Sequence, residues 1–510
     1  MLLKLVLLVI SPVYSDCANI LAVLPCPSYS HQIAYRHLWK ELSLRGHKVT
    51  LITPNPLHDP NLVNLTEIDM TSTYRFVRNI SRAVEDGMLT MWSSHAGMLE
   101  MMKAASEAQL SHPAVQDLIH DPKSFDVVFV EFLVPEWLAF AEIYKCPKVL
   151  FSSMEVTASL YHLTGNPAHP ILHPEFVSPF HGQLTFKERV MSTLVSWYYK
   201  YYFAFTVFPE RQKILNKYFD TNSTITGLIS DIDLMILSIS PLIQGPRALG
   251  PNTISIAGYR EDLSSQPLSP DVKKFLDDAK EGCIYVSFGS NVKSSQLSQR
   301  LLKAFIEALA DVPYKVLWKF ETATVGMPKN IKTAKWLPQQ KVLNHPNVKL
   351  FLSQGGLQSM EEAIYAEVPF VIIPFLSDQF QNSKILKDKG VAVVLNRQTL
   401  RKVELKNALM EVMNEPKYRD GVKKIKQLIL DEPMTGLEKA VWWTEYVIRN
   451  KGAKHLRNPT ADLPFYQYFL LDVLGFLFLI VILIVTALVL AVKKISNLLW
   501  KLCSEKAKTQ

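Results

Sequence analysis

The sequence predicts an α/β protein with two doubly wound parallel sheets, followed by one membrane-spanning helix. Short apolar runs alternate with longer amphipathic runs, and this alternation begins twice, at residue 19 and again near residue 283. Runs such as DVVFVEF (126–132) lack the two-residue period of half-exposed strands, as strands buried on both faces do. An uncharged run of 20 residues lies near the C-terminus.

Composition excludes several other classes of protein. The 510 residues are 48% hydrophobic and 20% charged, which excludes disorder as the main state and suggests two or three folded units. The 30 prolines follow no period, so collagen-like sequence is excluded. Half of the net charge of +8 lies in residues 493–510, where five lysines face one glutamate. The rest is nearly balanced, so a nucleic-acid partner has little support.

The N-terminal residues MLLKLVLLVISPVYS (1–15) have the features of a secretory signal peptide. One lysine precedes an apolar run too short to span a bilayer, and Val13 and Ser15 suit the cleavage site. The alternative is a first core strand, but residues 19–24 form a better strand directly afterwards. We therefore expect residues 16–472 to lie in the lumen of the secretory pathway.

The run at 473–492 is long enough to span a bilayer as a helix, since 20 residues at about 1.5 Å each cover about 30 Å. Lys493 and Lys494 mark its C-terminal side as cytoplasmic and predict a single-pass type I topology with the tail at 493–510. The terminal KAKTQ resembles a dilysine signal for return to the endoplasmic reticulum, although a solvated basic tail is the simpler alternative. Three lumenal glycosylation acceptors are predicted at Asn64, Asn79 and Asn222.

The alternation predicts individual elements between these ends. Strands are expected at 19–24, 48–52, 126–132, 148–151, 234–239, 253–256, 283–288, 314–319, 348–352, 370–373 and 391–395. Helices are expected at 33–44, 88–109, 299–309, 357–366, 380–388, 405–413 and 438–449. The predicted organisation is an N-terminal domain at 16–240, a Pro/Ser/Gly-rich linker at 241–270, a C-terminal domain at 271–450 and a juxtamembrane segment at 451–472.

An aromatic stretch, a pair of aspartates and the cysteines could each be functional, but each also has a purely structural interpretation. The stretch WYYKYYFAFTVF (197–208) holds eight aromatic residues and is either packed core, which we favour, or an acceptor wall or membrane-dipping face. Asp231 and Asp233 precede a strand and are interpreted as a turn. Cys17, Cys26, Cys146 and Cys283 are too few and too scattered for a disulfide framework or a metal site, and are expected to be mostly buried thiols.

Several catalytic motifs are missing from the sequence. It contains no GxGxxG, GxxxxGK[ST], HExxH, CxxC or GxSxG, so nicotinamide chemistry, P-loop hydrolysis, zinc proteolysis and nucleophile-elbow esterase chemistry lose their best evidence.

His31 and Glu131 form a candidate acid–base pair. His31 lies between the first strand and its helix, which Ser28 or Ser30 can cap. The positive helix end disfavours a charged imidazole, so we expect a neutral His31, as a general base requires. Glu131 ends another strand at the same sheet edge, where it can fix the tautomer of His31 and stabilise its protonated form.

The second array predicts an anion site. Gln354, Gly355 and Gly356 follow a strand and open a helix, so backbone can approach a diphosphate closely and helix N–H groups can bind it. The strand CIYVSF likewise ends in a Gly-Ser-Asn turn that contains Ser290.

The ordered string from Trp336 to Gln379, with WLPQ, QGGLQSMEEA, two prolines and DQ, resembles the signature of the UDP-glycosyltransferases. The resemblance covers nearly the whole chain and includes PSYSH, FDVVFVE, VSFGS, KGAKHLR (451–457) and the C-terminal span. Glutamine before the paired glycines is similar to arthropod members. Many members have aspartate in place of Glu131 and histidine in place of Gln354. These departures change the spacing of the pair and remove a titratable group, but do not argue for an inactive protein.

This resemblance implies a GT-B fold, in which two Rossmann-like domains face a cleft. It implies that the N-terminal domain holds an acceptor, with His31 as base and Glu131 as its partner, and that the C-terminal domain holds a UDP-sugar. By analogy Trp336 stacks on uracil, Gln339 lies beside the nucleoside, and Glu362 binds the ribose. By the same analogy the diphosphate is lined by Ser290, Gln354 and Ser359 with the glycines Gly355 and Gly356, and the sugar is held by Asp378 and Gln379.

The implied reaction is inverting transfer of a hexose to a hydroxyl of a small lipophilic acceptor, with no bound cofactor and no metal. Glucose is favoured as the donor sugar and glucuronate is the alternative. Detoxification is the expected role in the endoplasmic reticulum membrane, while a biosynthetic enzyme for one glycolipid or hormone conjugate and an inactive binding protein are alternatives. A homo-oligomer is left open.

Overall fold

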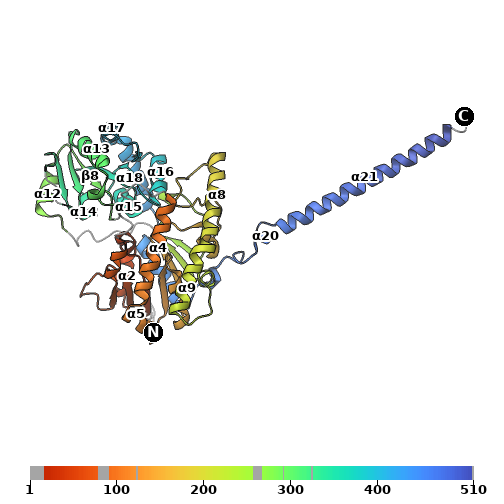
Figure 1. Ribbon diagram of the computed structural model, residues 1–510, viewed down its shortest axis with the longest axis horizontal. Helices are drawn as coiled ribbons and strands as arrows, with labels where there is room; N and C mark the ends of the chain where they lie inside the picture. The colour runs from red at the N-terminus through yellow and green to blue at the C-terminus, as the bar shows by residue number, and fades with distance from the viewer. Residues whose placement is uncertain are drawn as a thin grey trace, which may run out of the picture. The chain divides into compact units, whose positions relative to one another are not determined.

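A computed structural model describes residues 17–77, 91–121, 124–256, 267–290, 292–322 and 326–507. The chain divides into two compact units, Met1–Arg457 and Asn458–Gln510. The first unit contains two parallel sheets with helices packed around them (Figure 1). The predicted signal peptide, Asn79, residues 257–266 and the last three residues of the tail lie outside the described residues.

The first sheet has the strand order β3-β2-β1-β4-β5-β6-β7, and every neighbouring pair is parallel. Its strands are β1 (Asn19–Val23), β2 (Lys48–Thr53), β3 (Leu65–Asp69), β4 (Val127–Glu131), β5 (Lys148–Ser152), β6 (Leu234–Leu237) and β7 (Thr253–Ser255). The order reverses between β1 and β4, which makes that point the topological switch where such sheets bind ligands.

Helices connect these strands. They are α2 (Tyr29–Leu44), α4 (Met91–Leu110), α5 (Pro113–His120), α6 (Ala139–Tyr144), α7 (Ala158–Leu163), α8 (Phe186–Tyr202), α9 (Phe208–Tyr218), α10 (Ile225–Ser230) and α11 (Pro241–Gln244). Three shorter turns are η1 (Thr71–Phe76), η2 (Pro135–Leu138) and the π-helical η3 (Phe203–Val207).

The strands of the first sheet are buried on both faces. Leu21 and Val23 of β1 pack into one core, whereas Ile20 and Ala22 point into another with Trp39 of α2. Because successive side chains of a strand alternate between faces, a central strand must be apolar at every position, as β1 and β4 are.

The second sheet repeats the same winding, in the order β10-β9-β8-β11-β12-β13. Its strands are β8 (Cys283–Ser287), β9 (Lys315–Lys319), β10 (Ile331–Ala334), β11 (Val348–Ser353), β12 (Phe370–Ile372) and β13 (Ala392–Val394). Its helices are α12 (Pro270–Asp277), η4 (Ser294–Gln296), α13 (Gln299–Ala310), α14 (Gln339–Leu343), α15 (Leu357–Tyr365), α16 (Gln379–Asp388), α17 (Lys402–Asn414) and α18 (Pro416–Leu430). The switch point lies between β8 and β11, and the two doubly wound sheets agree with the predicted GT-B architecture.

Three features differ from the expected elements. The edge strands β3 and β10 were not predicted, because half-exposed edge strands lack a continuous apolar run. The favoured packed-core interpretation of residues 197–208 is wrong, since Trp197, Tyr201 and Phe205 are 57%, 58% and 77% exposed. In addition, α11 and β7 lie within the range predicted as a linker, and β7 is the last strand of the first sheet.

The second unit contains α20 (Phe465–Tyr468) and the long helix α21 (Leu471–Ala507). Within α21, Leu471–Leu502 contains an 18-residue window with a mean hydropathy of 3.3, so this helix is long and apolar enough to cross a membrane.

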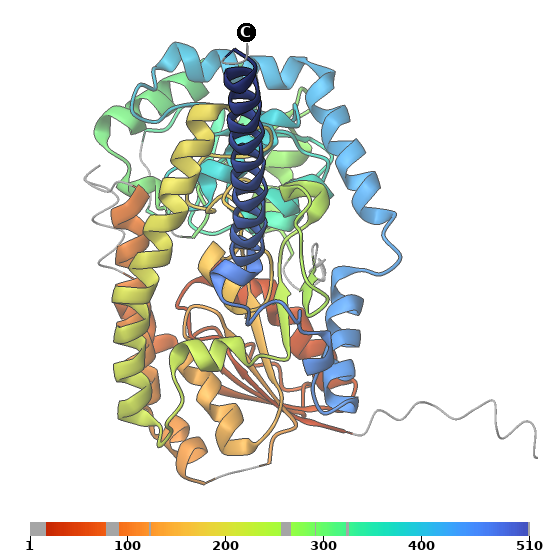
Figure 2. The same cartoon turned by 90° about the vertical axis from the view of Figure 1, so that its right-hand side faces the viewer.

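After α18 the chain returns to the first sheet through α19 (Gly436–Arg449) and η5 (Lys454–Leu456). Ala440, Val441 and Val447 of α19 pack into the core that contains α2, and Figure 2 shows this mid-blue helix beside the N-terminal elements. The buried Asp233 carboxylate fixes the returning segment, because it accepts hydrogen bonds from the backbone N–H groups of Ala453 (3.0 Å) and Lys148 (2.9 Å).

Replacing this carboxylate is expected to destabilise the first unit. Asp233→Ala should lower the free energy of unfolding by about 2–4 kcal/mol, because each buried N–H left unsatisfied costs about 1–3 kcal/mol. The matched control is Asp278→Ala, which removes an exposed ion pair with Lys274 and should cost about 0–1 kcal/mol. Denaturant unfolding of both variants measures the difference, and equal losses would contradict the anchoring role of Asp233.

Candidate active site

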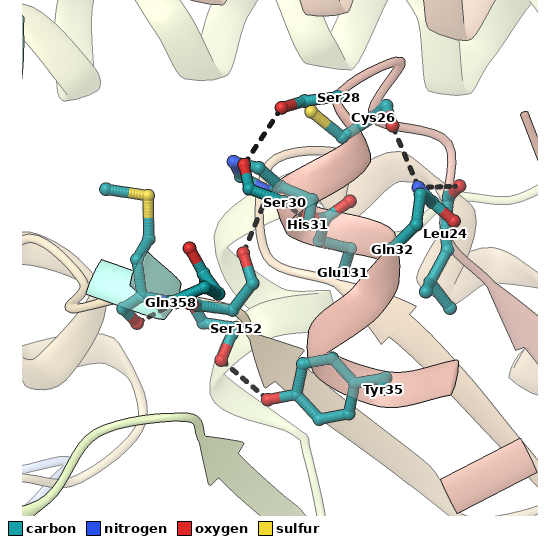
Figure 3. A network of polar contacts seen from close by, with 12 residues as sticks. Leu24, Cys26, Ser28, Ser30, His31, Gln32, Tyr35, Glu131, Ser152 and Gln358 are labelled. Atoms are coloured by element: carbon teal, nitrogen blue, oxygen red, sulfur yellow. Dashed lines mark hydrogen bonds and ion pairs between the residues drawn. The ribbon is translucent and has the colours of Figure 1, made fainter. Parts of the chain in front are cut away.

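The loop between β1 and α2 is held in place by side chains of α2 itself. The Gln32 amide donates to the carbonyls of Leu24 (3.1 Å) and Cys26 (2.8 Å), and its oxygen accepts from the Thr53 hydroxyl (2.7 Å). One turn later the Tyr35 hydroxyl donates to the Ser152 carbonyl at the end of β5 (2.5 Å). These bonds fix the first turn of α2, and with it His31, over the switch point of the first sheet (Figure 3).

His31 and Glu131 form the predicted pair. The Nδ1 atom of His31 lies 2.5 Å from Oε1 of Glu131 and 2.9 Å from the Ser153 hydroxyl. The histidine side chain is 11% exposed and the glutamate 1%. Because both contacts are made at Nδ1, the Nε2 atom is the ring nitrogen that can accept a proton from a ligand.

Two expectations about this turn are wrong. Ser28 is the N-cap residue, but its hydroxyl interacts with Ser30 and makes no capping bond. The predicted neutral bias of His31 is also wrong: burial lowers its pKa, but Cys26 and Glu131 outweigh burial, so the pKa lies well above the usual value. Burial raises the pKa of the Cys26 thiol, while His31 opposes this rise, so the thiol and the Glu131 carboxylate both bear on the proton of His31.

Cys26 is a site residue that the sequence analysis missed, although its place just after β1 is a signal. Ligand atoms of Cys26, His31 and Glu131 lie within 4.8 Å of one another, so these three residues could hold a metal ion. However, two ligands about 2.0 Å from a tetrahedral zinc lie about 3.3 Å apart. The 2.5 Å between His31 and Glu131 is too short for this, so as arranged the pair shares a proton.

The second switch point brings two glycine turns together. Gly289 follows β8 with φ +72°, and a Cβ there would come within 2.4 Å of the Gln354 amide nitrogen. Gly355 follows β11 with φ +82°, where a side chain would also meet Ile372 and Ser383 at 3.0 Å. Both positions therefore require glycine, and they bring Ser290 and Gln354 to one edge of the sheet.

The helix α15 begins at this edge. Its N-cap residue Gly356 has no side chain, and its first turn has no acidic residue, so the positive end of the helix is suited to an anion. Asp378 lies beside it, with hydrogen bonds from Asn382 (2.8 Å) and the N–H of Leu357. Burial raises the pKa of Asp378 to about 6, while Asn382 and His31 oppose this rise.

A polar cluster lies next to α15. The Gln339 amide donates to the Ser359 hydroxyl (2.9 Å) and to the Glu362 carboxylate (2.5 Å), and its oxygen accepts from Tyr285 (3.2 Å). The structure thus brings together Gln339, Ser359 and Glu362, as the resemblance implies.

Trp336 is 51% exposed rather than part of the core. Its ring is perpendicular to that of Tyr29 of α2, with the two centroids 5.4 Å apart, and Lys319 Nζ lies 5.1 Å from its centre. About half of the indole surface is therefore open, while Lys319 and Tyr29 cover part of the rest.

Contacts between the two sheets join the two switch points. The Gln358 amide of α15 donates to the Ser153 carbonyl (2.7 Å), next to the hydroxyl that contacts His31. Ser153 and Gln358 were not predicted, although Ser153 directly follows the end of β5, where the rule that selected His31 applies. His31 is also close enough to Asp378 to lower the pKa of the Asp378 carboxyl.

The side chains of Gln379, Asn222 and Asn64 differ in whether their polar groups are free to contact a ligand or a glycan. The Gln379 side-chain oxygen accepts from the N–H groups of Phe375 (2.8 Å) and Leu376 (2.9 Å), so only its NH₂ is left for a sugar. Asn222 is exposed, as a glycosylation acceptor should be. Asn64 is half-buried, and its amide donates to the Ser43 carbonyl (3.2 Å).

Glu131→Gln should lower the pKa of His31, because burial then acts without the opposing carboxylate charge. Histidine NMR titration measures the shift, with His31→Asn assigning the signal among the 13 histidines. Glu142→Gln is the matched control, since Glu142 instead binds Thr221 and Ser223. An unchanged pKa in Glu131→Gln would show that the carboxylate does not hold the proton.

Comparison with known proteins identifies the family. The family described as "UDP-glucoronosyl and UDP-glucosyl transferase" matches residues 19–509. UDP-glucosyltransferase 2 of Dactylopius coccus is 34% identical over 473 residues, which cover 91% of this chain and 90% of that protein. UDP-glucuronosyltransferase 2B7 of Homo sapiens is 30% identical over 472 residues and 88% of each chain.

The solved structures confirm the fold. The crystal structure of TcCGT1 in complex with UDP matches with a TM-score of 0.59 and 13% identity, over 86% of this chain and all of that one. At this identity the likeness bears on architecture alone, and it agrees with the GT-B arrangement of the two sheets. Together with the match over residues 19–509, these findings show that the chain is an enzyme of the UDP-glycosyltransferase family.

Proposed function

We propose that this enzyme transfers a hexose from a UDP-sugar to a hydroxyl of a small lipophilic acceptor, with inversion at the anomeric carbon. The observation that carries the proposal is the His31–Glu131 pair, 2.5 Å apart, joined through Ser153 and Gln358 to the start of α15. A base and an anion site at adjoining sheet edges suit a reaction that removes a proton from one substrate and releases a diphosphate from the other.

The proposed base is Nε2 of His31. It takes the proton of the acceptor hydroxyl as the oxygen attacks the anomeric carbon from the face opposite UDP. Glu131 stabilises the resulting imidazolium, whose pKa it already raises. General-base catalysis of this kind contributes about 10²–10⁴ in rate.

The proposed donor site is the edge of the second sheet. Backbone N–H groups at Gly355, Gly356 and the start of α15 would stabilise negative charge on the departing UDP. Ser290, Gln354 and Ser359 would line the diphosphate, Gln339 and Glu362 the nucleoside, and Asp378 and Gln379 the sugar. No step is assigned to a metal ion, and turnover is expected to be unchanged by EDTA.

Glucose is the proposed sugar. The Dactylopius coccus relative is named as a glucosyltransferase, and the proposed donor residues include no lysine or arginine to pair with the carboxylate of glucuronate. Glucuronate is the second candidate, since the human relative is named for it.

We also propose a single-pass type I protein of the endoplasmic reticulum, with residues 16–472 in the lumen. The apolar helix α21, the two lysines Lys493 and Lys494 after its apolar run, and the exposed Asn222 support this orientation.

The donor is tested by turnover with radiolabelled UDP-glucose against UDP-glucuronate, on a panel of phenols, sterols and ceramides. UDP-glucose should give the higher kcat/KM. His31→Ala should lose about 10²–10⁴ in kcat while binding of the donor stays nearly intact. Unchanged turnover in this variant would remove His31 from the mechanism, and a higher kcat/KM with UDP-glucuronate would overturn glucose.

Trp336→Ala should weaken UDP binding by about 1–3 kcal/mol, the range for stacking of a base on an aromatic ring. Because Trp336 is half-exposed, the melting temperature should be unaltered. Trp442→Ala is the matched control, since Trp442 is also exposed but lies on α19. Calorimetric titration with UDP compares the variants, and wild-type affinity in Trp336→Ala would exclude the stacking role.

A further inference from the structure

The outer face of α8 is apolar where a solvent-facing helix is normally polar. Its residues follow one another at intervals of four, four, three, four and four, which places them on one side of a helix. We call this set the α8 stripe: Phe186, Val190, Leu194, Trp197, Tyr201 and Phe205. All six are between 42% and 77% exposed, and Met191 and Tyr198, at 43% and 52%, widen the stripe.

The opposite face of α8 is already packed. Val195 and Tyr199 are buried there together with Ser192 and Ser196, and the Ser192 hydroxyl donates to the Pro170 carbonyl (2.5 Å). The buried face thus holds two serines beside Val195 and Tyr199, while several large apolar side chains face outwards, which departs from the usual pattern. The helix α8 already packs on the first unit through its opposite face. The stripe is therefore not the face that attaches α8 to the core of this unit.

The helix is also held firmly. Thr185 and Glu188 form a capping box at its start, and it runs through the π-helical turn η3 into α9 without a break (Figures 1 and 2). Within the stripe the rings of Tyr201 and Phe205 stack at 6.1 Å. The stripe is therefore a continuous surface on a rigid helix.

The charges beside the stripe indicate the kind of partner. Within α8, Lys187, Arg189 and Lys200 flank the stripe and Glu188 is the single acid, while Glu100 of α4 lies close enough to act on Tyr202. The Arg189 guanidinium lies 5.7 Å from the centre of the Phe186 ring. Trp, Tyr and Phe with basic neighbours are typical of helices that lie in the membrane interface and meet anionic headgroups. A second copy of this chain would instead bring the same basic residues face to face.

We propose that the α8 stripe lies in the headgroup region of the lipid bilayer, as a second membrane contact besides α21. This inference rests on the proposed membrane anchor. Residues 458–470 separate the first unit from α21, and 13 residues extend to at most about 45 Å. A tethered surface is present at high effective concentration, so even weak apolar contacts are occupied.

The contact has a consequence for the acceptor. The buried face of α8 packs on α7, and α7 follows the segment in which Ser153 contacts His31. A helix that lies on the bilayer would therefore bring the acceptor edge of the first sheet close to the phase into which lipophilic acceptors partition. Apolar acceptors would then reach His31 from the bilayer rather than from water.

The direct test uses the full chain in phosphatidylcholine–phosphatidylserine vesicles, without any sugar donor. Bromine in the acyl chains quenches nearby indoles, and the difference between wild type and Trp197→Phe isolates the emission of Trp197. If the stripe lies about 5–10 Å into the bilayer, bromine near the ester end should reduce that difference by roughly half or more, and bromine near the methyl end should reduce it less.

Flotation separates the two ways in which the test can fail. A chain that does not float with the vesicles overturns the membrane anchor and this proposal with it. A chain that floats but leaves Trp197 unquenched overturns this proposal alone. Trp197 emission that is unquenched and also shifts on dilution from dimer to monomer would show that a second copy covers the stripe.

A paired variant tests the consequence for acceptors. Leu194→Glu with Tyr201→Glu should raise KM for an apolar acceptor in vesicles by roughly tenfold, because two apolar anchors leave the interface, while KM for a water-soluble phenol and for the UDP-sugar should not change. The matched control, Val403→Glu with Leu428→Glu, alters equally exposed apolar residues on α17 and α18. An equal rise in KM for both acceptors, or the same rise in KM for the apolar acceptor in the control variant, would overturn the role of the stripe in acceptor access.

Discussion

The hydrogen bond from the Gln358 amide to the Ser153 carbonyl joins the two sheets at the point on which the site depends. Each sheet alone offers half of a site, because a doubly wound sheet presents ligand-binding loops only beyond the carboxyl ends of its strands. His31 and Glu131 belong to the first sheet, and the glycine turns of Gly289 and Gly355 to the second. The return of α19 to the first sheet, held by Asp233, ties the halves together a second time.

The electrostatics of the first half impose a compromise on the proposed base. Glu131 orients the ring of His31 and stabilises its charged form, which favours the step in which His31 takes a proton. The same carboxylate, together with Cys26, raises the pKa of the free ring, so the ring takes up a proton at a higher pH than an ordinary histidine does. Only the unprotonated ring of His31 can take a proton from the acceptor. We therefore expect activity to rise with pH until the pH exceeds the pKa of His31.

Much of this arrangement could be predicted from the sequence, for identifiable reasons. Strands buried on both faces produce apolar runs, so β1 and β4 and the residues at their ends were evident. The edge strands β3 and β10 were missed because edge strands are half-exposed and carry polar residues. The charge of His31 was misjudged because the effect of the helix end was weighed above that of the predicted carboxylate partner, which lies only 2.5 Å from Nδ1. Cys26 and Ser153 follow strand ends and could have been selected by the rule that selected His31, whereas Gln358 acts through a tertiary contact that no local pattern contains.

The interpretation of residues 197–208 was wrong for a more general reason. Aromatic content alone predicts burial, because aromatic side chains gain most from leaving water. A helix in the membrane interface leaves water as well, so the same composition serves both environments and only the direction of the side chains separates them. In α8 the small polar Ser192 and Ser196 face inwards and Trp197 and Tyr201 face outwards. The inverted direction is therefore the physical argument for the proposed bilayer contact, which would bring the proposed acceptor side of the enzyme to the surface on which lipophilic molecules collect.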